Sequence, residues 1–427
     1  MRLKINQFEA IITFLLLLEV NFFCIIPFPN FFYIINSHFH KVVTLFIALV
    51  LFIKTPIKYI KKRKTLFHDF VFIFLAAWFF ILVYSVINYT NTNLFGAFLD
   101  YYYFLIILLY YYIFQKCIDN DSNFKFIQRI IKQVAVMFSI ILLFQYFMLN
   151  KGVHFLAFND SFLSVNTENR MLGGFEIVLY SGVFFCSDLF DFDSRSVRIK
   201  ALVAIFIELL YLAIVAKSRS SVIIYVVMIF FSLSMNLRNR TTRKILTFLF
   251  ISIFLIAILL TYSNIIDYFQ LSRGSSYRQR IREVVFYFDN IFANGVIGIG
   301  FLRDSTENAM ALHGFENLYY TSDIGLLGFI AIWGLIGILL LIYFAIKCIK
   351  VLRAVSNKIG KYHNLVICTL LYIICTSINL SMFDVQRIIY FPIMLAIMDC
   401  CYFRINNKEY RGVIKGDGCS NSNCNLQ

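Results

Sequence analysis

Two segments between apolar stretches concentrate residue types that bind anions. Residues 217–221 hold a lysine, an arginine and three serines, and residues 272–282 hold four arginines. An arginine side chain binds phosphate through two parallel, charge-assisted hydrogen bonds, and a helix would place Arg278 and Arg282 on one face. Both segments, with Arg219 in the first, are therefore candidate phosphate or diphosphate sites. The alternatives are snorkelling at a membrane interface and contact with lipid headgroups.

A third segment, residues 313–328, combines His313 and Glu316 with Tyr320 and Asp323. If a helix begins here, Glu316, Tyr320 and Asp323 share a face because they are spaced by four and three residues. A carboxylate or imidazole at the mouth of a helix can accept a proton from a hydroxyl, which typically contributes about 10²–10⁴ in rate. The alternative is helix capping and interaction with the helix dipole, which suits Asp323 better than His313 or Glu316.

Gly295, Gly298 and Gly300 form a short glycine cluster. The cluster follows no clear strand and opens no βαβ unit, so it is not a dinucleotide-binding motif. We expect these glycines to make tight turns and to let the backbone pack closely against the membrane helices.

The elements that must position these residues are apolar helices. Of the 427 residues, 60% are apolar or aromatic and 15% are charged, whereas soluble proteins have roughly half and a quarter. The apolar residues form runs of the roughly 20 residues that a membrane-spanning helix needs. The net charge of +15 lies in the gaps between these runs, which argues against a nucleic-acid-binding surface.

The sequence predicts an all-α polytopic integral membrane protein with about twelve transmembrane helices. Cytoplasmic N and C termini place 28 of the 39 lysines and arginines in cytoplasmic segments, in agreement with the positive-inside rule. The first apolar run lacks a small-residue cleavage site and is interpreted as a membrane helix. The predicted helices span residues 8–26, 39–55, 69–87, 99–115, 130–149, 174–190, 200–216, 220–236, 245–262, 324–346, 364–382 and 388–403.

This topology divides the chain into helices one to nine (1–262), a large external loop (263–323), helices ten to twelve (324–403) and a polar cytoplasmic tail (404–427). Within the loop, apolar residues at helical spacing beside a charged face predict an amphipathic helix over residues 277–291. The ten cysteines include no pair at metal-binding spacing, so we expect structural roles for them.

Together these segments resemble the bacterial O-antigen polymerase and O-antigen ligase superfamily. The matching features, in order, are the Ser-Arg-Ser turn at 218–220, the arginine-rich stretch 273–282, the glycines of 298–300, and the motifs beginning at Glu316 and Asp323. The resemblance extends over residues 200–345. It implies a membrane fold similar to that of family C glycosyltransferases, with the large loop on the periplasmic side.

The resemblance implies a glycosyltransferase of the bacterial inner membrane that acts on undecaprenyl-diphosphate-linked oligosaccharides at the periplasmic face. A polymerase of this kind moves the growing glycan from its lipid diphosphate onto a new lipid-linked repeat unit. Arg219, Arg278 and Arg282 would bind the diphosphate and stabilise its developing charge, and Glu316 or His313 would be the catalytic base. No metal or cofactor is implied. The implied partners are the lipid-linked glycan donor and acceptor, membrane lipids, a chain-length regulator and a flippase.

Two other functions stay open at this point. Ligase-like members carry His before Asn in the motif where this chain has Glu316 before Asn317, which favours a polymerase. A transporter of lipid-linked sugars would place its polar residues near mid-membrane, often in broken helices. The charges inside the predicted helices are few, namely Glu19, Glu176 and Glu208, with Glu208 a candidate intramembrane site.

Overall fold

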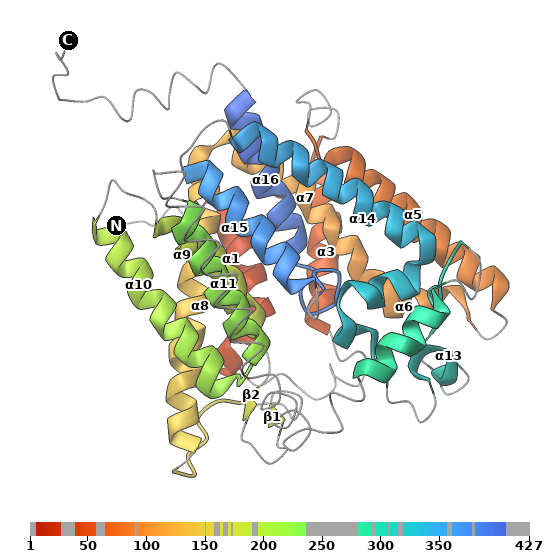
Figure 1. Ribbon diagram of the computed structural model, residues 1–427, viewed down its shortest axis with the longest axis horizontal. Coiled ribbons are helices and arrows are strands. Elements are labelled where there is room, and N and C mark those ends of the chain that lie inside the picture. Colours follow the sequence, from red (N-terminus) through yellow and green to blue (C-terminus); the bar gives the residue numbers. More distant parts are fainter. Residues whose placement is uncertain are drawn as a thin grey trace.

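The computed structural model shows a bundle of helices (Figure 1). In the described part of the chain, the regular structure is helical except for the antiparallel strands Leu163–Ser164 (β1) and Arg170–Met171 (β2). The described residues are 6–26, 39–56, 65–89, 92–149, 151–157, 163–164, 170–171, 174–189, 195–235, 280–291, 296–303, 305, 308–314, 319–356, 361–377 and 381–406.

The helices keep the order of the predicted segments. A 3-10 segment, Tyr102–Leu108, joins α6 to α7, and a π-helical segment, Tyr211–Val215, ends α10. Residues 280–290 are also helical. The labelled helices are Gln7–Glu19 (α1), Phe39–Lys54 (α3), His68–Asn88 (α5), Leu94–Tyr101 (α6), Leu109–Asp119 (α7), Asp121–Leu149 (α8), Phe175–Asp188 (α9), Arg195–Leu210 (α10), Arg219–Met235 (α11), Ala309–His313 (α13), Leu326–Ser356 (α14), Lys361–Thr376 (α15) and Tyr390–Asn406 (α16).

Four helical stretches of the described residues are long and apolar enough to cross a bilayer. They are α5, the stretch Leu94–Asp119, α8 and α14. Large apolar side chains on α5, including Phe72 and Phe79, are more than half exposed, as expected of a helix that faces lipid. Helices also lie within eleven of the twelve predicted segments, and residues 245–262 lie outside the described part. The number of spans and the side on which each terminus lies stay predictions.

Buried polar contacts fix which helix ends lie together. Arg404 near the end of α16 pairs with Asp121 at the start of α8 (Nη1–Oδ1, 2.5 Å) and donates to the carbonyl oxygen of Cys117 in α7 (2.9 Å). The guanidinium carbon of Arg404 also lies 4.2 Å from the ring centroid of Phe124. Arg387 precedes α16, so the length of that helix, about 25 Å, separates it from Arg404. We call these two ends of the bundle the Arg404 end and the Arg387 end.

Helix α14 is interrupted at Gly334 (φ 61°), and the glycine cluster packs into the interruption. The backbone N–H groups of Ile299 and Gly300 donate to the carbonyls of Ala331 (2.8 Å) and Ile332 (2.9 Å). A Cβ on Gly298 would lie 1.9 Å from the Ala331 oxygen. This confirms the predicted close backbone packing at Gly298 and Gly300; Gly295 lies outside the described residues. The loop thus satisfies carbonyl groups that the break in α14 leaves without intrahelical partners.

The segment before α14 does not form the helix that would align Tyr320 with Asp323. A helix over residues 316–323 would have placed Tyr320 and Asp323 on a common face. Instead, Tyr320 is extended (φ −126°, ψ 127°), and Thr321–Ile324 forms a single 3-10 turn. Gly325 then adopts a left-handed conformation (φ 60°), and α14 begins only at Leu326. Because Gly325 allows this reversal at little steric cost, Asp323 precedes the helix and does not line it.

Candidate functional site

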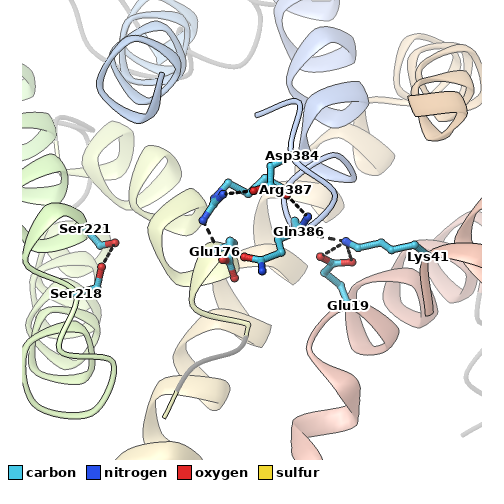
Figure 2. A network of polar contacts seen from close by, with 8 residues as sticks. All are labelled: Glu19, Lys41, Glu176, Ser218, Ser221, Asp384, Gln386 and Arg387. Carbon is cyan, nitrogen blue, oxygen red and sulfur yellow. Dashed lines mark hydrogen bonds and ion pairs between the residues drawn. The ribbon is translucent and has the colours of Figure 1, made fainter. Parts of the chain in front are cut away.

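A buried ion-pair cluster lies at the Arg387 end (Figure 2). Nη2 of Arg387 is 3.3 Å from Oε1 of Glu176, and Nη1 is 3.2 Å from Oδ2 of Asp384. The side chains of all three residues are less than 10% exposed. Charges that are removed from water to this degree need close partners to offset the cost of desolvation. The three side chains therefore hold one another in place.

Local sequence explains how these residues are presented. Phe383 donates its backbone N–H to the Ser381 hydroxyl (3.1 Å), and Gln386 donates its own to Oδ1 of Asp384 (3.2 Å). Such side-chain-to-backbone bonds are typical of turns, and here they shape the segment 381–389 between α15 and α16. Glu176 lies in the first turn of α9, where a carboxylate interacts favourably with the helix dipole.

A second ion pair supports the same turn. Nζ of Lys41, at the start of α3, lies 2.5 and 2.6 Å from the carboxylate oxygens of Glu19, at the end of α1. The same Nζ is 3.4 Å from the carbonyl oxygen of Gln386, the residue before Arg387. Figure 2 shows the two pairs on either side of the turn. Residues from α1, α3, α9 and the 381–389 turn thus meet at one place.

The charge of this cluster limits what it can bind. Two cations, Lys41 and Arg387, face three carboxylates, those of Glu19, Glu176 and Asp384. When all five are ionised, the cluster has one more negative than positive charge. It therefore offers a carboxylate, and not a spare cation, to a substrate.

Asp384 also lines a small cleft of about 50 Å³, enough space for a few water-sized groups. An ionised carboxylate in such a cleft can accept a proton from a hydroxyl group placed there. The side chains of Thr321, Ser381 and Tyr103 add further polar groups to its wall. The complete lining is Tyr103, Phe104, Thr321, Gly325, Gly328, Phe329, Ile332, Ser381, Phe383 and Asp384.

A larger apolar groove adjoins the cleft. It has a volume of about 400 Å³, lies between α14 and α15, and shares Phe383 with the cleft. Its walls are almost entirely apolar and suit an alkyl or isoprenoid chain, because such a chain binds favourably to apolar surface away from water. The lining residues are Leu326, Leu341, Phe344, Ala345, Cys348, Ile349, Leu352, Leu370, Ile373, Ile374, Ser377, Met382 and Phe383.

The structure places the sequence-predicted residues in different regions. Arg219 is the exposed first residue of α11. The hydroxyl of Ser218, just before this helix, lies 2.7 Å from the hydroxyl of Ser221 in its first turn. Arg282 is exposed on the helix 280–290. His313 ends α13, and its Nδ1 lies 2.9 Å from the carbonyl oxygen of Tyr319.

These residues are not gathered into one site in the described part of the chain. Helices α11 and α13, which contain Arg219 and His313 respectively, stand on opposite sides of the molecule in Figure 1. Arg278 and Glu316 lie outside the described residues. The sequence interpretation missed Asp384 and Arg387. One signal was present: an acid and an arginine share the short turn between the last two predicted helices, where the positive-inside rule disfavours arginine.

Glu208, the intramembrane candidate, is enclosed by neighbouring helices. Its carboxylate accepts hydrogen bonds from the hydroxyls of Ser181 in α9 (2.6 Å) and Tyr225 in α11 (2.5 Å). The side chain is fully buried, and it lines neither the cleft nor the groove. These contacts join α9, α10 and α11, so Glu208 has a role in packing these three helices together.

No protein-family model matches this chain, and no curated protein sequence matches it. The function must therefore be argued from the residues and geometry of the chain itself. Those residues combine a carboxylate-lined cleft, an adjoining apolar groove and exposed arginines.

Proposed function

We propose that the chain polymerises undecaprenyl-diphosphate-linked oligosaccharide repeat units into O-antigen or a related surface polysaccharide. In this proposal it is a multi-pass glycosyltransferase of the bacterial inner membrane, with twelve spans and both termini in the cytoplasm. The Arg387 end and the loop 263–323 then face the periplasm. A chain-length regulator and a flippase are its proposed protein partners.

The observation that supports this proposal best is the contact between the cleft and the groove. Phe383 lines both, so a molecule with an isoprenoid tail in the groove would have its polar head near the cleft. A lipid-linked sugar has this combination of a long apolar chain and a polar head. The groove volume accommodates only part of such a chain, and the rest would extend into lipid beside α14 and α15.

The proposed reaction is a transfer of the glycan from a diphosphate to a hydroxyl. The acceptor hydroxyl oxygen forms a bond to the anomeric carbon of the donor glycan, while the bond from that carbon to the diphosphate oxygen breaks. The acceptor proton passes to a carboxylate, and undecaprenyl diphosphate leaves. We assign the proton acceptor to Asp384 first, because Asp384 lines the cleft. Glu316 and His313 are retained as alternatives.

Cations are needed where negative charge develops on the leaving diphosphate. The guanidinium of Arg387 is already paired with Glu176 and Asp384. Arg387 therefore suits a role in positioning these carboxylates better than a role in binding the diphosphate. Arg219, Arg278 and Arg282 remain the proposed diphosphate-binding residues. Arg219→Ala and Arg278→Ala should each abolish polymer at unchanged protein level, and normal polymer in both variants would remove this assignment.

A transporter of lipid-linked oligosaccharide is the second candidate, favoured by the break in α14 at Gly334. Broken helices commonly form substrate sites in transporters. In this chain, however, the carbonyls at the break already accept hydrogen bonds from Ile299 and Gly300. These contacts leave fewer backbone groups for a transported substrate, which favours the polymerase.

Deletion of the gene followed by electrophoresis of the surface polysaccharide tests the proposed function. A polymerase predicts loss of the long-chain ladder with a single repeat unit still attached to its acceptor. Complete loss of attached sugar would contradict the proposal and would support a ligase or a flippase. Restoration by the intact gene in trans is the control for effects on neighbouring genes.

A further inference from the structure

The helix 280–290 has an apolar stripe on its exposed face. Ile281, Val284, Val285 and Phe288 follow the spacing i, i+3, i+4 and i+7, which places them on one side of a helix. Their side chains are 48, 42, 55 and 61% exposed. The sequence predicts this amphipathic character, but the structure shows that the apolar side faces outward.

The opposite face of this helix is attached to the protein. On this face Glu283 and Tyr287 are 1% and 0% exposed, and Tyr287 belongs to a small hydrophobic cluster that reaches α14. The Tyr287 hydroxyl is 2.6 Å from the carbonyl oxygen of Leu312 and 3.1 Å from that of Tyr319. Burial of this phenol raises the pKa of Tyr287, so it remains a hydrogen-bond donor. The exposed orientation of the stripe is thus fixed by contacts on the other side.

Two arginines flank the stripe. At 100° per residue, Arg280 falls on one side of the four apolar residues and Arg282 on the other. Both are exposed. A helix with an apolar face bordered by arginines matches the composition of helices that lie in the plane of an anionic membrane surface.

The apolar surface continues onto neighbouring membrane-capable helices. Ile87 at the end of α5 and Phe95 at the start of α6 are 75 and 71% exposed. The hydrophobic cluster beneath the helix 280–290 packs against Tyr89, which follows α5 directly. Asn308, which precedes α13, lies 3.5 Å from the Thr92 hydroxyl. Figure 1 shows the loop helices beside α6.

We propose that the helix 280–290 lies in the membrane interface, with Ile281, Val284, Val285 and Phe288 among the acyl chains and Arg280 and Arg282 at anionic headgroups. The occupant of the stripe is therefore the lipid bilayer itself. This role rests on the chain being a membrane protein and is independent of its catalytic activity. Through its contact with lipid, the helix 280–290 fixes how far the loop lies from the groove.

Spin labelling of the full-length protein in lipid nanodiscs tests the depth of this helix. Val285→Cys and Phe288→Cys carry the label, and Asp289→Cys is the reference at the polar edge of the stripe, 100° around the helix from Phe288. Unsubstituted protein labelled in parallel supplies the background from native cysteines. In nanodiscs of phosphatidylglycerol and phosphatidylcholine, labels at Val285 and Phe288 should collide with oxygen and lose collisions with a water-soluble nickel complex. Their depth should be about 5–10 Å below the headgroup boundary, and the Asp289 label should remain accessible to nickel.

Equal accessibility of the Phe288 and Asp289 labels to nickel would overturn the proposal, because the stripe would then face water. Protection of Val285 from both oxygen and nickel would also overturn it, because the stripe would then be covered by protein or by a second copy. The charge contribution has its own test: Arg280→Glu combined with Arg282→Glu should move the Val285 label toward water in phosphatidylglycerol nanodiscs. An unchanged depth of the Val285 label in this double variant would overturn the proposed contact of Arg280 and Arg282 with the headgroups.

Discussion

Arg387 and Glu176 are 211 residues apart in the sequence, and their side chains form a buried ion pair with an Nη2–Oε1 distance of 3.3 Å. The pair connects the turn before α16 to the first turn of α9. Asp384 holds the other side of the guanidinium and lines the cleft. The position of the proposed proton acceptor thus depends on a contact between two distant parts of the chain.

Replacement of Arg387 should disturb both stability and activity. Arg387→Ala leaves Glu176 and Asp384 buried without their cation, which typically costs about 3–5 kcal/mol in the free energy of unfolding. We expect a lower melting temperature in detergent and loss of polymer in cells. Arg387→Lys should retain more stability but little polymer, because an ammonium cannot reproduce the two-sided geometry of the guanidinium. Arg353→Ala, at an exposed arginine of α14, is the control and should change neither property.

Asp384→Asn tests the carboxylate with almost no change in shape. If Asp384 takes the proton from the hydroxyl group of the acceptor glycan, the polymerisation rate should fall by about 10²–10⁴-fold. The protein level and the gel-filtration profile should be maintained. The measurement is the length distribution of the polysaccharide at matched protein levels. Asp289→Asn is the matched control, since Asp289 is exposed on the helix 280–290 and does not line the cleft. A ladder of normal length from Asp384→Asn would assign the proton transfer to another residue.

Filling the groove should block the proposed lipid tail. Ala345 lines the groove, and Ala345→Trp adds a large side chain there without touching the ion-pair cluster. We expect shorter or absent polymer with little change in melting temperature. Leu339→Trp adds the same side chain at an exposed position of α14 that does not line the groove, and it should polymerise normally. Polymer of equal length and amount from the two variants would contradict the assignment of the groove as a substrate site.

The packing of the loop into α14 predicts a severe effect at Gly298. In Gly298→Ala the new Cβ would lie 1.9 Å from the Ala331 carbonyl oxygen, and neither backbone can move away without loss of hydrogen bonds. We expect destabilisation of about 3 kcal/mol, the upper end of the range that overpacking typically costs. Gly152→Ala is the control: Gly152 has φ +77° but nothing within 4 Å of its would-be Cβ, so only the left-handed strain of about 1–2 kcal/mol applies. Thermal unfolding in detergent should rank the two variants in this order.

A double-mutant cycle can measure the coupling between Lys41 and Glu19. Lys41→Met and Glu19→Leu each leave one buried charge without its partner, and we expect about 3–5 kcal/mol of destabilisation from each. The double variant should be destabilised by less than the sum, because no charge is stranded. Simple additivity in thermal unfolding would show that the two side chains do not interact in solution.

Features that depend on local sequence could be predicted. The amphipathic helix within 277–291 and the close packing of Gly298 and Gly300 were predicted and are present, whereas Arg219 and Ser220 of the predicted turn at 218–220 begin α11. Each follows from residue type and spacing over a few residues. The clustering of apolar residues into runs long enough to span a bilayer also predicted the membrane-helical class.

The candidate site could not be assembled in the same way. Asp384 and Arg387 are close in sequence, but their significance comes from Glu176 and from the cleft, which four separate elements form. A single sequence carries no record of such long-range contacts. The conditional helix through Tyr320 and Asp323 is absent for a different reason: Gly325 permits a left-handed reversal, and the spacing of the acids cannot reveal it.

The central claim is tested most directly with purified protein in nanodiscs and purified lipid-linked repeat units. A polymerase should produce lipid-linked glycans of two or more repeat units, together with free undecaprenyl diphosphate, and Asp384→Asn should yield neither product. Repeat units that stay at single length with the intact, folded protein would contradict it.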